Sequence, residues 1–350
     1  FRFDSKAPPG ERRTQFMIRD PSPDPARPWI LESTQLDLGL EDPRSHAVTV
    51  AETADGLALA FFGGPHAGLL DQGIWFMRRR QGVWEKARRV AKPREATTIC
   101  WNPVLHVLPD GTLLLFYKEG ERCASWWGLL TRSYDGGDTW ERAAPLPRGI
   151  LGPIRNKAVA VDDDTLLCGS STEDGPWSVH FEHMRDAGAS WSRTPSVHEG
   201  QPLGAIQPTI LPWPSGRWQT LCRSRVGCVV ETFSDDGGHT WTSLVETPLP
   251  NPNAALDGIV LDDRRALIVY NPSLPGRFMH DHRAQLALGL TEDGGASWKQ
   301  LALLEDEKAG ESSYPAIIRA EDGLAHVAYT TGEGWRGVKH IVIDPEALPC

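Results

Sequence analysis

Short apolar runs joined by tight polar turns recur along the chain. In six places an apolar run of strand length enters a turn that contains Asp, Gly or Ser, and a second apolar run follows. These segments are 46–62, 102–117, 157–170, 207–222, 257–270 and 314–329. Pairs of apolar runs joined in this way predict β-hairpins. We therefore expect an all-β chain without a substantial helix.

In most of these modules a third run leads into a repeated eight-residue phrase with the pattern S/T-x-D-x-G-x-x-W. The clearest copy runs from Ser133 to Trp140, two more end at Trp241 and Trp298, and a degenerate copy ends at Trp191. The Asp side chain of such a turn accepts hydrogen bonds from backbone N–H groups. Gly supplies backbone angles that other residues resist, and the Trp ring folds back beneath the turn.

The spacing of the phrase predicts the architecture. Trp84 ends the third run of the first module, where the rest of the phrase is missing. When Trp84 is included, consecutive Trp residues of this set lie 50 to 57 residues apart. Repeats of this length are typical of propellers. The sixth module has three strands, the third at 338–343, and the segment 29–38 can supply the fourth. We predict a six-bladed β-propeller of four-stranded antiparallel blades, closed by strands from both ends of the chain.

Composition agrees with this architecture and narrows the partners. The 34 Gly and 28 Pro residues suit short strands and turns, so we assign 29–350 to a single propeller domain and the Pro-rich 1–28 to an extended arm. A net charge of −10 argues against nucleic acid and anionic membranes, and no apolar run is long enough for a membrane span. We expect neither nucleic-acid binding nor membrane insertion.

The cysteines do not suggest a metal site. The six Cys residues have no C-x-x-C pair and no spacing typical of zinc ligands. Several of them fall inside predicted strands, which favours buried free thiols, and Cys100 with Cys123 is the one pair that merits a test for a disulfide. We expect no metal and no cofactor.

Strand direction predicts which side chains meet. In an antiparallel blade the start of the first strand, the end of the second and the start of the third share one face of the ring, which we call the first rim. The hairpin turns and the repeated phrases share the opposite face, the second rim. Polar residues that a core would not select gather on the first rim: Arg44, His46, Asn102, Arg155, Lys157, Gln207, Asp257 and Tyr314 at strand starts, and Asp71, Lys118, Glu173, Arg223, Arg225 and Arg283 in the strand ends and loops.

The first rim has an excess of basic residues although the whole chain is acidic. Guanidinium groups bind carboxylates through two parallel hydrogen bonds, and pockets form at the mouths of propellers. We predict a small ligand that bears a carboxylate, such as a sialic or uronic acid at the end of a sugar chain. The alternative is a solvated rim whose charges pair with one another.

These features resemble the sialidase superfamily, specifically its Asp-box (bacterial neuraminidase repeat) propellers, across residues 44–343. The family holds a substrate carboxylate with three arginines, and the first stands in an F-R-I-P-A stretch of which this chain keeps the Arg and the Ala. The matching arginines here are Arg44, Arg223 or Arg225, and Arg283. The resemblance implies Tyr314 as the nucleophile and Asp71 as the acid/base residue.

One position departs from the family pattern. The glutamate that activates the tyrosine opens blade four in the family, and Gln207 stands there in this chain. A neutral amide cannot accept the tyrosine proton, so Glu173 is the candidate substitute. Several phrases, among them 101–105 and 152–157, look like a less characterised branch. Related propellers there include lyases and rhamnosidases active on rhamnose–glucuronate linkages, in which a histidine is important, and His46 fits that role.

Three functions follow from these residues. The first is an exo-acting glycoside hydrolase for a terminal acidic sugar of an oligo- or polysaccharide. The second is a polysaccharide lyase, in which Lys118, Arg155 or Lys157 neutralises a uronate and His46 or Tyr314 removes the proton beside it. The third is a glycan-binding propeller without catalysis, which the neutral Gln207 supports. The convergence of a Tyr, an Asp and several His on one rim favours an enzyme.

Overall fold

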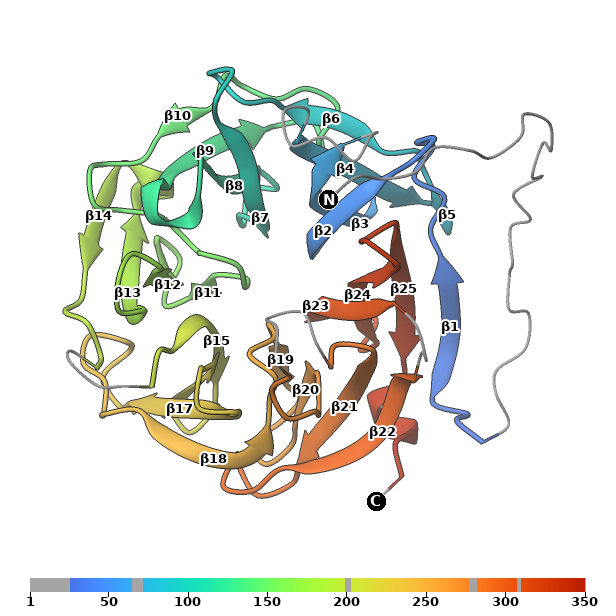
Figure 1. Ribbon diagram of the computed structural model, residues 1–350, viewed down its shortest axis with the longest axis vertical. Coiled ribbons are helices and arrows are strands. Elements are labelled where there is room, and N and C mark those ends of the chain that lie inside the picture. The colour runs from blue at the N-terminus through green and yellow to red at the C-terminus, as the bar shows by residue number, and fades with distance from the viewer. Residues whose placement is uncertain (1–25, 65–71, 199–202, 277–281, 307–309, 350) are drawn as a thin grey trace.

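The computed structural model describes residues 26–64, 72–198, 203–276, 282–306 and 310–349, which form six antiparallel sheets arranged in a ring (Figure 1). The predicted six-bladed propeller is confirmed. In the described residues the only helices are three single-turn 3₁₀ segments, η2 (Cys123–Ser125), η3 (Asp186–Gly188) and η4 (Pro345–Ala347). Most of the predicted arm, 1–28, lies outside the described residues, so that assignment stays a prediction.

The strands follow the chain around the ring. Blade one contains β2 (Arg44–Thr53), β3 (Gly56–Gly64) and β4 (Gly73–Arg80), with β5 (Val83–Trp84) and β6 (Arg88–Ala91) both paired to β4. Blade two contains β7 (Ile99–Val107), β8 (Leu113–Gly120), β9 (Trp127–Ser133) and β10 (Ala144–Pro145). Blade three contains β11 (Val159–Ala160), β12 (Thr165–Thr172), β13 (Ser178–Arg185) and β14 (Ser190–Arg193).

Blade four contains β15 (Ile206–Pro212), β16 (Trp218–Arg223), β17 (Cys228–Ser234) and β18 (Val245–Pro250). Blade five contains β19 (Asp257–Val260), β20 (Ala266–Tyr270), β21 (Gln285–Thr291) and β22 (Lys299–Asp306). Blade six contains β23 (Glu311–Arg319), β24 (Ala325–Gly332), β25 (Gly337–Ile343) and β1 (Ile30–Gln35). The outer position of blade one differs from the prediction of four strands per blade, because two short strands share it.

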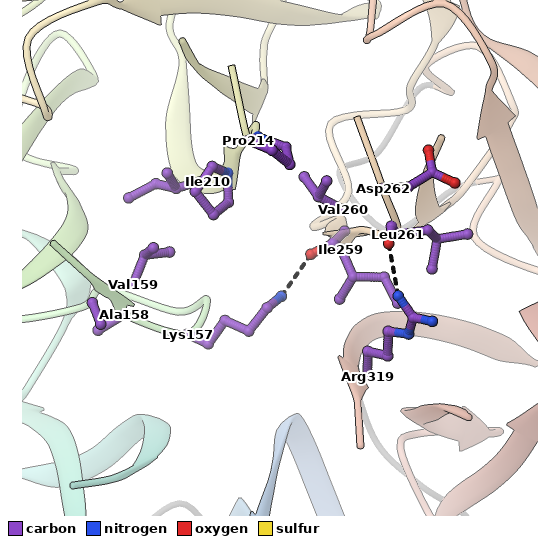
Figure 2. Close-up of a pocket in the computed structure, with 13 residues that line it drawn as sticks. Lys157, Ala158, Val159, Ile210, Pro214, Ile259, Val260, Leu261, Asp262 and Arg319 are labelled. Atoms are coloured by element: carbon purple, nitrogen blue, oxygen red, sulfur yellow. Dashed lines mark hydrogen bonds between the residues drawn. The ribbon is translucent and has the colours of Figure 1, made fainter. Parts of the chain in front are cut away.

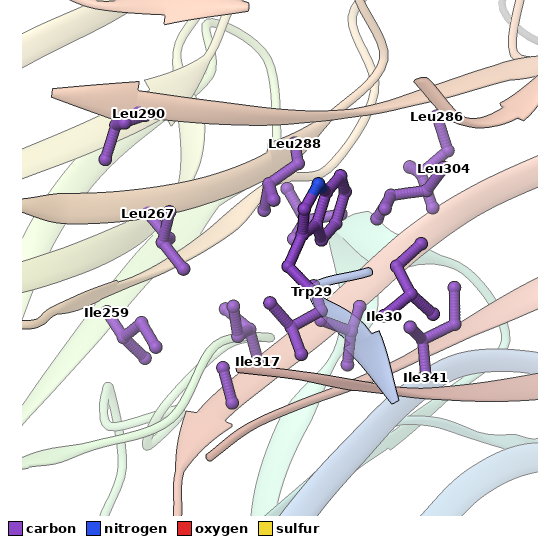
Figure 3. Close-up of a cluster of buried hydrophobic side chains, with 14 of the residues drawn as sticks. Trp29, Ile30, Ile259, Leu267, Leu286, Leu288, Leu290, Leu304, Ile317 and Ile341 are labelled. Carbon is purple, nitrogen blue, oxygen red and sulfur yellow. The ribbon is translucent and has the colours of Figure 1, made fainter. Parts of the chain in front are cut away.

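Strands from the two ends of the chain close the ring, as predicted. β1 pairs antiparallel with β25, from Ile30 opposite Ile343 to Gln35 opposite Lys339. Trp29 and Ile30 are buried in an apolar cluster that includes side chains of blades five and six (Figure 3). Closure therefore removes an unpaired sheet edge and fills the core between two blades.

The repeated phrase folds as its residues predict. Asp135 Oδ1 accepts a hydrogen bond from the backbone N–H of Thr139 at 2.8 Å, and Trp140 Nε1 donates to the carbonyl of Gly137 at 3.1 Å. Hydrogen bonds from the hydroxyl and the backbone of Thr139 hold the pKa of Asp135 well below its usual range. The degenerate copy keeps the indole bond, from Trp191 to the carbonyl of residue 188, at 3.1 Å.

Each of these turns also joins its blade to the preceding one. Trp140 lies edge-on against Phe76 of blade one, with ring centroids 5.3 Å apart. Arg78, also in blade one, donates to Asp138 Oδ1 at 2.6 Å. Gly137 has φ of +94°, and a Cβ atom there would lie 2.5 Å from the Phe76 ring. The glycine is required both for the backbone angle and for the close approach of the two blades.

We expect Gly137→Ala to lower the free energy of unfolding by roughly 2–4 kcal/mol, because overpacking against Phe76 adds to the cost of the left-handed backbone. Gly111→Ala is the matched control, since Gly111 has φ of +84° and open space where its Cβ would lie. The control should lose only about 1 kcal/mol. Urea unfolding of both variants measures the difference, and equal losses would show that contact between the blades contributes nothing.

Candidate active site

Four inner strands begin with the same irregularity on the first rim. In β2, β7, β15 and β23 two residues oppose one residue of the neighbouring strand, which is a β-bulge. In each bulge one residue has a left-handed backbone: Ala47, Asn102, Gln207 and Tyr314, with φ between +32° and +56°. Such backbones cost about 1–3 kcal/mol each and cluster at functional sites. The bulges change the direction of the side chains at these strand starts. Three of the four left-handed residues, Asn102, Gln207 and Tyr314, are site residues predicted from the sequence.

Three arginines surround the ring of Tyr314. The guanidinium carbons of Arg155, Arg223 and Arg283 lie 5.6, 5.8 and 5.6 Å from the centroid of that ring. Arg223 Nη1 also donates to the Tyr314 hydroxyl oxygen at 2.8 Å. Each arginine is only 2% exposed, and they come from blades three, four and five. The predicted convergence of distant basic and aromatic residues is therefore present.

The positive charge of these arginines is only partly balanced. Arg283 forms an ion pair with Glu311, Nη1 to Oε1, at 3.4 Å. Within the described residues, Arg155 and Arg223 have only neutral hydrogen-bond partners. Arg155 donates to the Asn156 side chain at 2.7 Å and to the carbonyl of Val48 at 3.4 Å. Burial lowers the pKa of Arg155 to about 10, against the opposing field of Asp257. A buried excess of positive charge is suited to an anionic ligand.

Gln207 connects Arg223 to Glu173. Its amide oxygen accepts from Arg223 Nη1 at 3.2 Å, and its amide nitrogen donates to Glu173 Oε1 at 3.3 Å. The hydrogen-bonded path from Glu173 to Tyr314 thus runs through Gln207 and Arg223. Burial raises the pKa of Glu173 above its ordinary value, although the charge of Arg223 opposes that shift.

An aromatic wall borders Tyr314 on the side of blade one. The His46 ring lies 4.1 Å from the Tyr314 ring and stacks on Trp335 at 4.3 Å with an interplanar angle of 20°. Trp335 Nε1 in turn donates to Glu311 Oε2 at 2.7 Å. The glutamate that pairs with Arg283 therefore also holds this wall in place.

Sequence reasoning missed Glu311, Trp335, Asn253 and Trp177. Asn253 accepts from Arg223 Nε at 2.8 Å and its carbonyl accepts from Arg283 at 2.8 Å. Trp177 lies beneath the exposed guanidinium of Arg225, 3.9 Å from the ring centroid. Asn253, Trp177 and Trp335 lie in loops of variable length, where strand order does not predict position. Of the two arginine candidates in blade four, the structure places Arg223 against Tyr314 and Arg225 on Trp177.

Other predicted residues lie elsewhere. Lys118 is completely buried and its amine donates to the carbonyl of Pro153, so its expected place at an open mouth is wrong. Burial also lowers the pKa of Lys118 to about 7. Arg44 donates to the carbonyl of Gly334 on blade six, and Arg155 takes the place at Tyr314 for which Arg44 was a candidate. Asn102 is buried and donates to a backbone carbonyl of blade three at 3.3 Å. Asp71 lies outside the described residues.

Lys157 and Asp257 satisfy each other inside the central channel. Asp257 Oδ1 accepts from Lys157 Nζ at 2.8 Å and from the Thr209 hydroxyl at 2.6 Å, and its Oδ2 accepts from the backbone of Ile317 at 3.0 Å. This one carboxylate therefore joins blades three, four, five and six. Its contacts indicate a structural tie, and its role in binding substrate stays a prediction.

A cavity of about 460 Å³ lies beside Lys157, between inner strands of blades three, four and five (Figure 2). Its walls are mainly the apolar ends of inner strands, and Arg319 at its edge donates to the carbonyl of Leu261 at 2.6 Å. The polar groups of Lys157 and Arg319 are thus occupied by protein partners.

The described residues contain no group of three His, Cys, Asp or Glu side chains that could hold a metal ion. Cys100 and Cys123 are free thiols, as are the other three described cysteines. No helix in the described part of the chain is long and apolar enough to cross a membrane.

The fold and its repeated turns define an Asp-box propeller, and comparisons with known proteins agree. The chain matches the BNR repeat-like domain over residues 55–327, which is more than half of its length. The chain therefore belongs to this family, and the predicted resemblance to Asp-box (bacterial neuraminidase repeat) propellers is confirmed. No curated protein sequence gives a significant match.

Several solved structures share the fold. A protein of unknown function from Dyadobacter fermentans DSM 18053 aligns with a TM-score of 0.74 and 17% identity over 90% of this chain and 98% of that one. The NanB sialidase of Streptococcus pneumoniae aligns with a TM-score of 0.70 and 12% identity, over 92% and 71%. The intramolecular trans-sialidase of Ruminococcus gnavus aligns with a TM-score of 0.69 and 12% identity, over 89% and 96%. At these identities the likeness establishes the fold.

We expect Asp257→Ala to lower the free energy of unfolding by about 3–5 kcal/mol, because it leaves the Lys157 ammonium and buried donors without their carboxylate. Glu292→Ala is the control, since Glu292 forms an exposed pair with Lys299 at 2.7 Å, and it should change stability by less than about 1 kcal/mol. Urea unfolding measures both variants. A loss at Asp257 no larger than the control would contradict the tie.

Proposed function

We propose that the protein is an exo-acting glycoside hydrolase that releases a terminal sugar bearing a carboxylate from an oligo- or polysaccharide. The observation that carries this proposal is the set of three buried arginines around Tyr314, of which only Arg283 has a carboxylate within ion-pair distance among the described residues. A substrate carboxylate would supply the missing negative charge, and arginines recognise that group through paired hydrogen bonds. Arg155, Arg223 and Arg283 are the proposed carboxylate-binding residues.

Tyr314 is the proposed group beside the reacting carbon. Its hydroxyl would attack that carbon or stabilise the cationic transition state, and a phenol avoids placing a second carboxylate against that of the substrate. The hydrogen bond from Arg223 would orient the phenolic oxygen and stabilise negative charge on it. Asp71 remains the proposed acid that protonates the leaving oxygen. Glu173 would act by holding the Gln207 amide in the orientation that accepts from Arg223.

The names of the structural neighbours support an acidic nine-carbon sugar as the first substrate class to test. Two of them are called a sialidase and an intramolecular trans-sialidase. A uronate at the end of a chain presents the same carboxylate, so both classes belong in the assay.

A lyase is the second candidate, favoured by the position of His46. The imidazole lies against Tyr314 at 4.1 Å, so either group could remove the proton beside a uronate carboxylate held by Arg155. Elimination would leave an unsaturated sugar that absorbs in the near ultraviolet, whereas hydrolysis would not.

The deciding experiment incubates the protein with sialoside, glucuronide and rhamnose–glucuronate substrates and follows both new reducing ends and ultraviolet absorbance. Reducing ends without absorbance support the hydrolase, and reducing ends with absorbance support the lyase. Binding of a sugar acid without any product would overturn both and indicate a glycan-binding propeller.

Arg223→Ala is expected to lower kcat/KM by about 10³-fold or more, because it removes a buried charge that bonds to Tyr314 and faces the carboxylate. Arg225→Ala is the matched control, two residues away and exposed on Trp177. The kcat/KM of Arg225→Ala should fall by less than about tenfold. Similar losses in the two variants would count against the arrangement around Tyr314.

The raised pKa of Glu173 predicts the acid limb of the pH profile. Glu173 is ionised only above a pKa that lies higher than that of an ordinary glutamate, so kcat/KM should fall as the pH drops through that value. Glu173→Gln should remove this limb and lower the plateau. The profile of kcat/KM between pH 4 and pH 8 checks it, and an unchanged acid limb in the variant would show that another group titrates.

A further inference from the structure

Arg155 reaches the first rim on a segment that has almost no strand pairing. Sequence patterning predicts an inner strand from residue 157, but the paired part of that strand, β11, is only Val159–Ala160. By contrast, β23 in blade six runs for nine residues. Side chains must therefore supply much of the hydrogen bonding that positions residues 151–156.

Two buried ionisable residues from neighbouring blades hold this segment. Glu182, on β13, accepts from the backbone N–H of Leu151 at 3.1 Å and of Gly152 at 2.6 Å. Lys118, on β8, donates to the carbonyl of the next residue, Pro153. Both Lys118 and Glu182 are 0% exposed. The amine of Lys118, from blade two, and the carboxylate of Glu182, from blade three, therefore clamp three consecutive residues of the loop.

Neutral contacts complete the support on both sides of Arg155. The side chain of Asn102 donates to the carbonyl of Ile154 at 3.3 Å, and the backbone N–H of Ile154 donates to a carbonyl of β12 at 3.0 Å. On the other side, the Asn156 side chain donates to the carbonyl of Gln207 at 3.1 Å. The backbone that carries Arg155 is thus held from blades two, three and four.

Burying Lys118 and Glu182 has a cost, which their contacts with the loop backbone offset. Moving an ion from water into a protein interior costs several kcal/mol, and buried ion pairs are often replaced by apolar residues without loss of stability. Unpaired backbone groups of a buried loop, however, require partners. Glu182 and Lys118 supply these partners at the residues that lead into Arg155.

We infer that Lys118 and Glu182 are positioning residues that set the affinity of the first-rim site for its carboxylate ligand by fixing Arg155. This inference rests on the proposed function, because it assumes that Arg155 contacts the carboxylate. It also replaces the direct contact with substrate that the sequence suggests for Lys118.

The first arm of the test measures backbone protection and needs no activity. Hydrogen–deuterium exchange of the peptide covering 149–157 is compared between the wild type, Lys118→Met and Arg78→Met. Arg78 is a matched control, since it is a 4%-exposed cation whose partners, Glu85 and Asp138, lie in blade one and at the second rim. Exchange in 149–157 should rise at least about tenfold in Lys118→Met and stay unchanged in Arg78→Met. Equal protection in all three proteins would overturn the clamp.

The second arm measures affinity. Sialic acid and glucuronic acid are titrated by calorimetry, and KM and kcat are measured for the substrate that the assay above identifies. Lys118→Met should raise Kd and KM about tenfold or more, with kcat changed less than about threefold. The double variant Lys118→Met with Arg155→Ala should have the same Kd and KM as Arg155→Ala alone. A lower Tm with unchanged Kd, or additive effects, would overturn the positioning role.

Two further outcomes are distinguishable. If Lys118→Met does not fold, Glu182→Gln takes its place, since it keeps one acceptor oxygen for the loop and should show the same changes with smaller size. If neither acid binds and no substrate turns over, the proposed function and the affinity role both fail. The exchange arm then reports on the clamp alone.

Discussion

Closure of the ring is the constraint on which the first-rim site depends. Tyr314 lies on blade six, whereas the arginines that face it lie on blades three, four and five. Blade six obtains its outer strand from the other end of the chain, through the pairing of β1 with β25. Trp29 and Ile30 then fill the core that blade six shares with blade five. This pairing holds blade six, which carries Tyr314, against the blades that carry the arginines. The segment that forms β1 therefore supports the site without contacting it.

Buried charges in this propeller have two distinct uses. Asp257 and Lys157 pair across the channel, and Glu182 and Lys118 hold backbone groups of a loop, so each of these charges has partners that explain its burial. Arg155 and Arg223 instead make their hydrogen bonds to neutral groups of the described residues. Because an uncompensated buried charge is costly, this contrast separates structural ions from those that suit an anionic ligand.

Gln207 changes the electrostatics of the site as well as its acid–base chemistry. A glutamate at this position would add a negative charge beside Arg223 and partly cancel it. The neutral amide still accepts a hydrogen bond from that guanidinium, which also donates to Tyr314, but it adds no negative charge. The site thereby keeps more positive charge, and the residue at position 207 supplies no base for the tyrosine. Glu173, with its raised pKa, lies one hydrogen bond further away.

The sequence by itself determined the architecture of this protein, because the signals involved are local. The Asp, Gly and Trp of each repeated phrase lie within eight residues, and their spacing counts the blades and sets strand direction. Strand direction was sufficient to bring Tyr314, Arg223, Arg283, Gln207 and Glu173 to one rim. Only the tertiary structure decided that Arg155 stands at Tyr314 while Arg44 bonds to Gly334, and that Lys118 is buried beneath a loop. Those outcomes depend on loop conformation, on bulges that turn a side chain, and on contacts between blades, none of which a short stretch of sequence encodes.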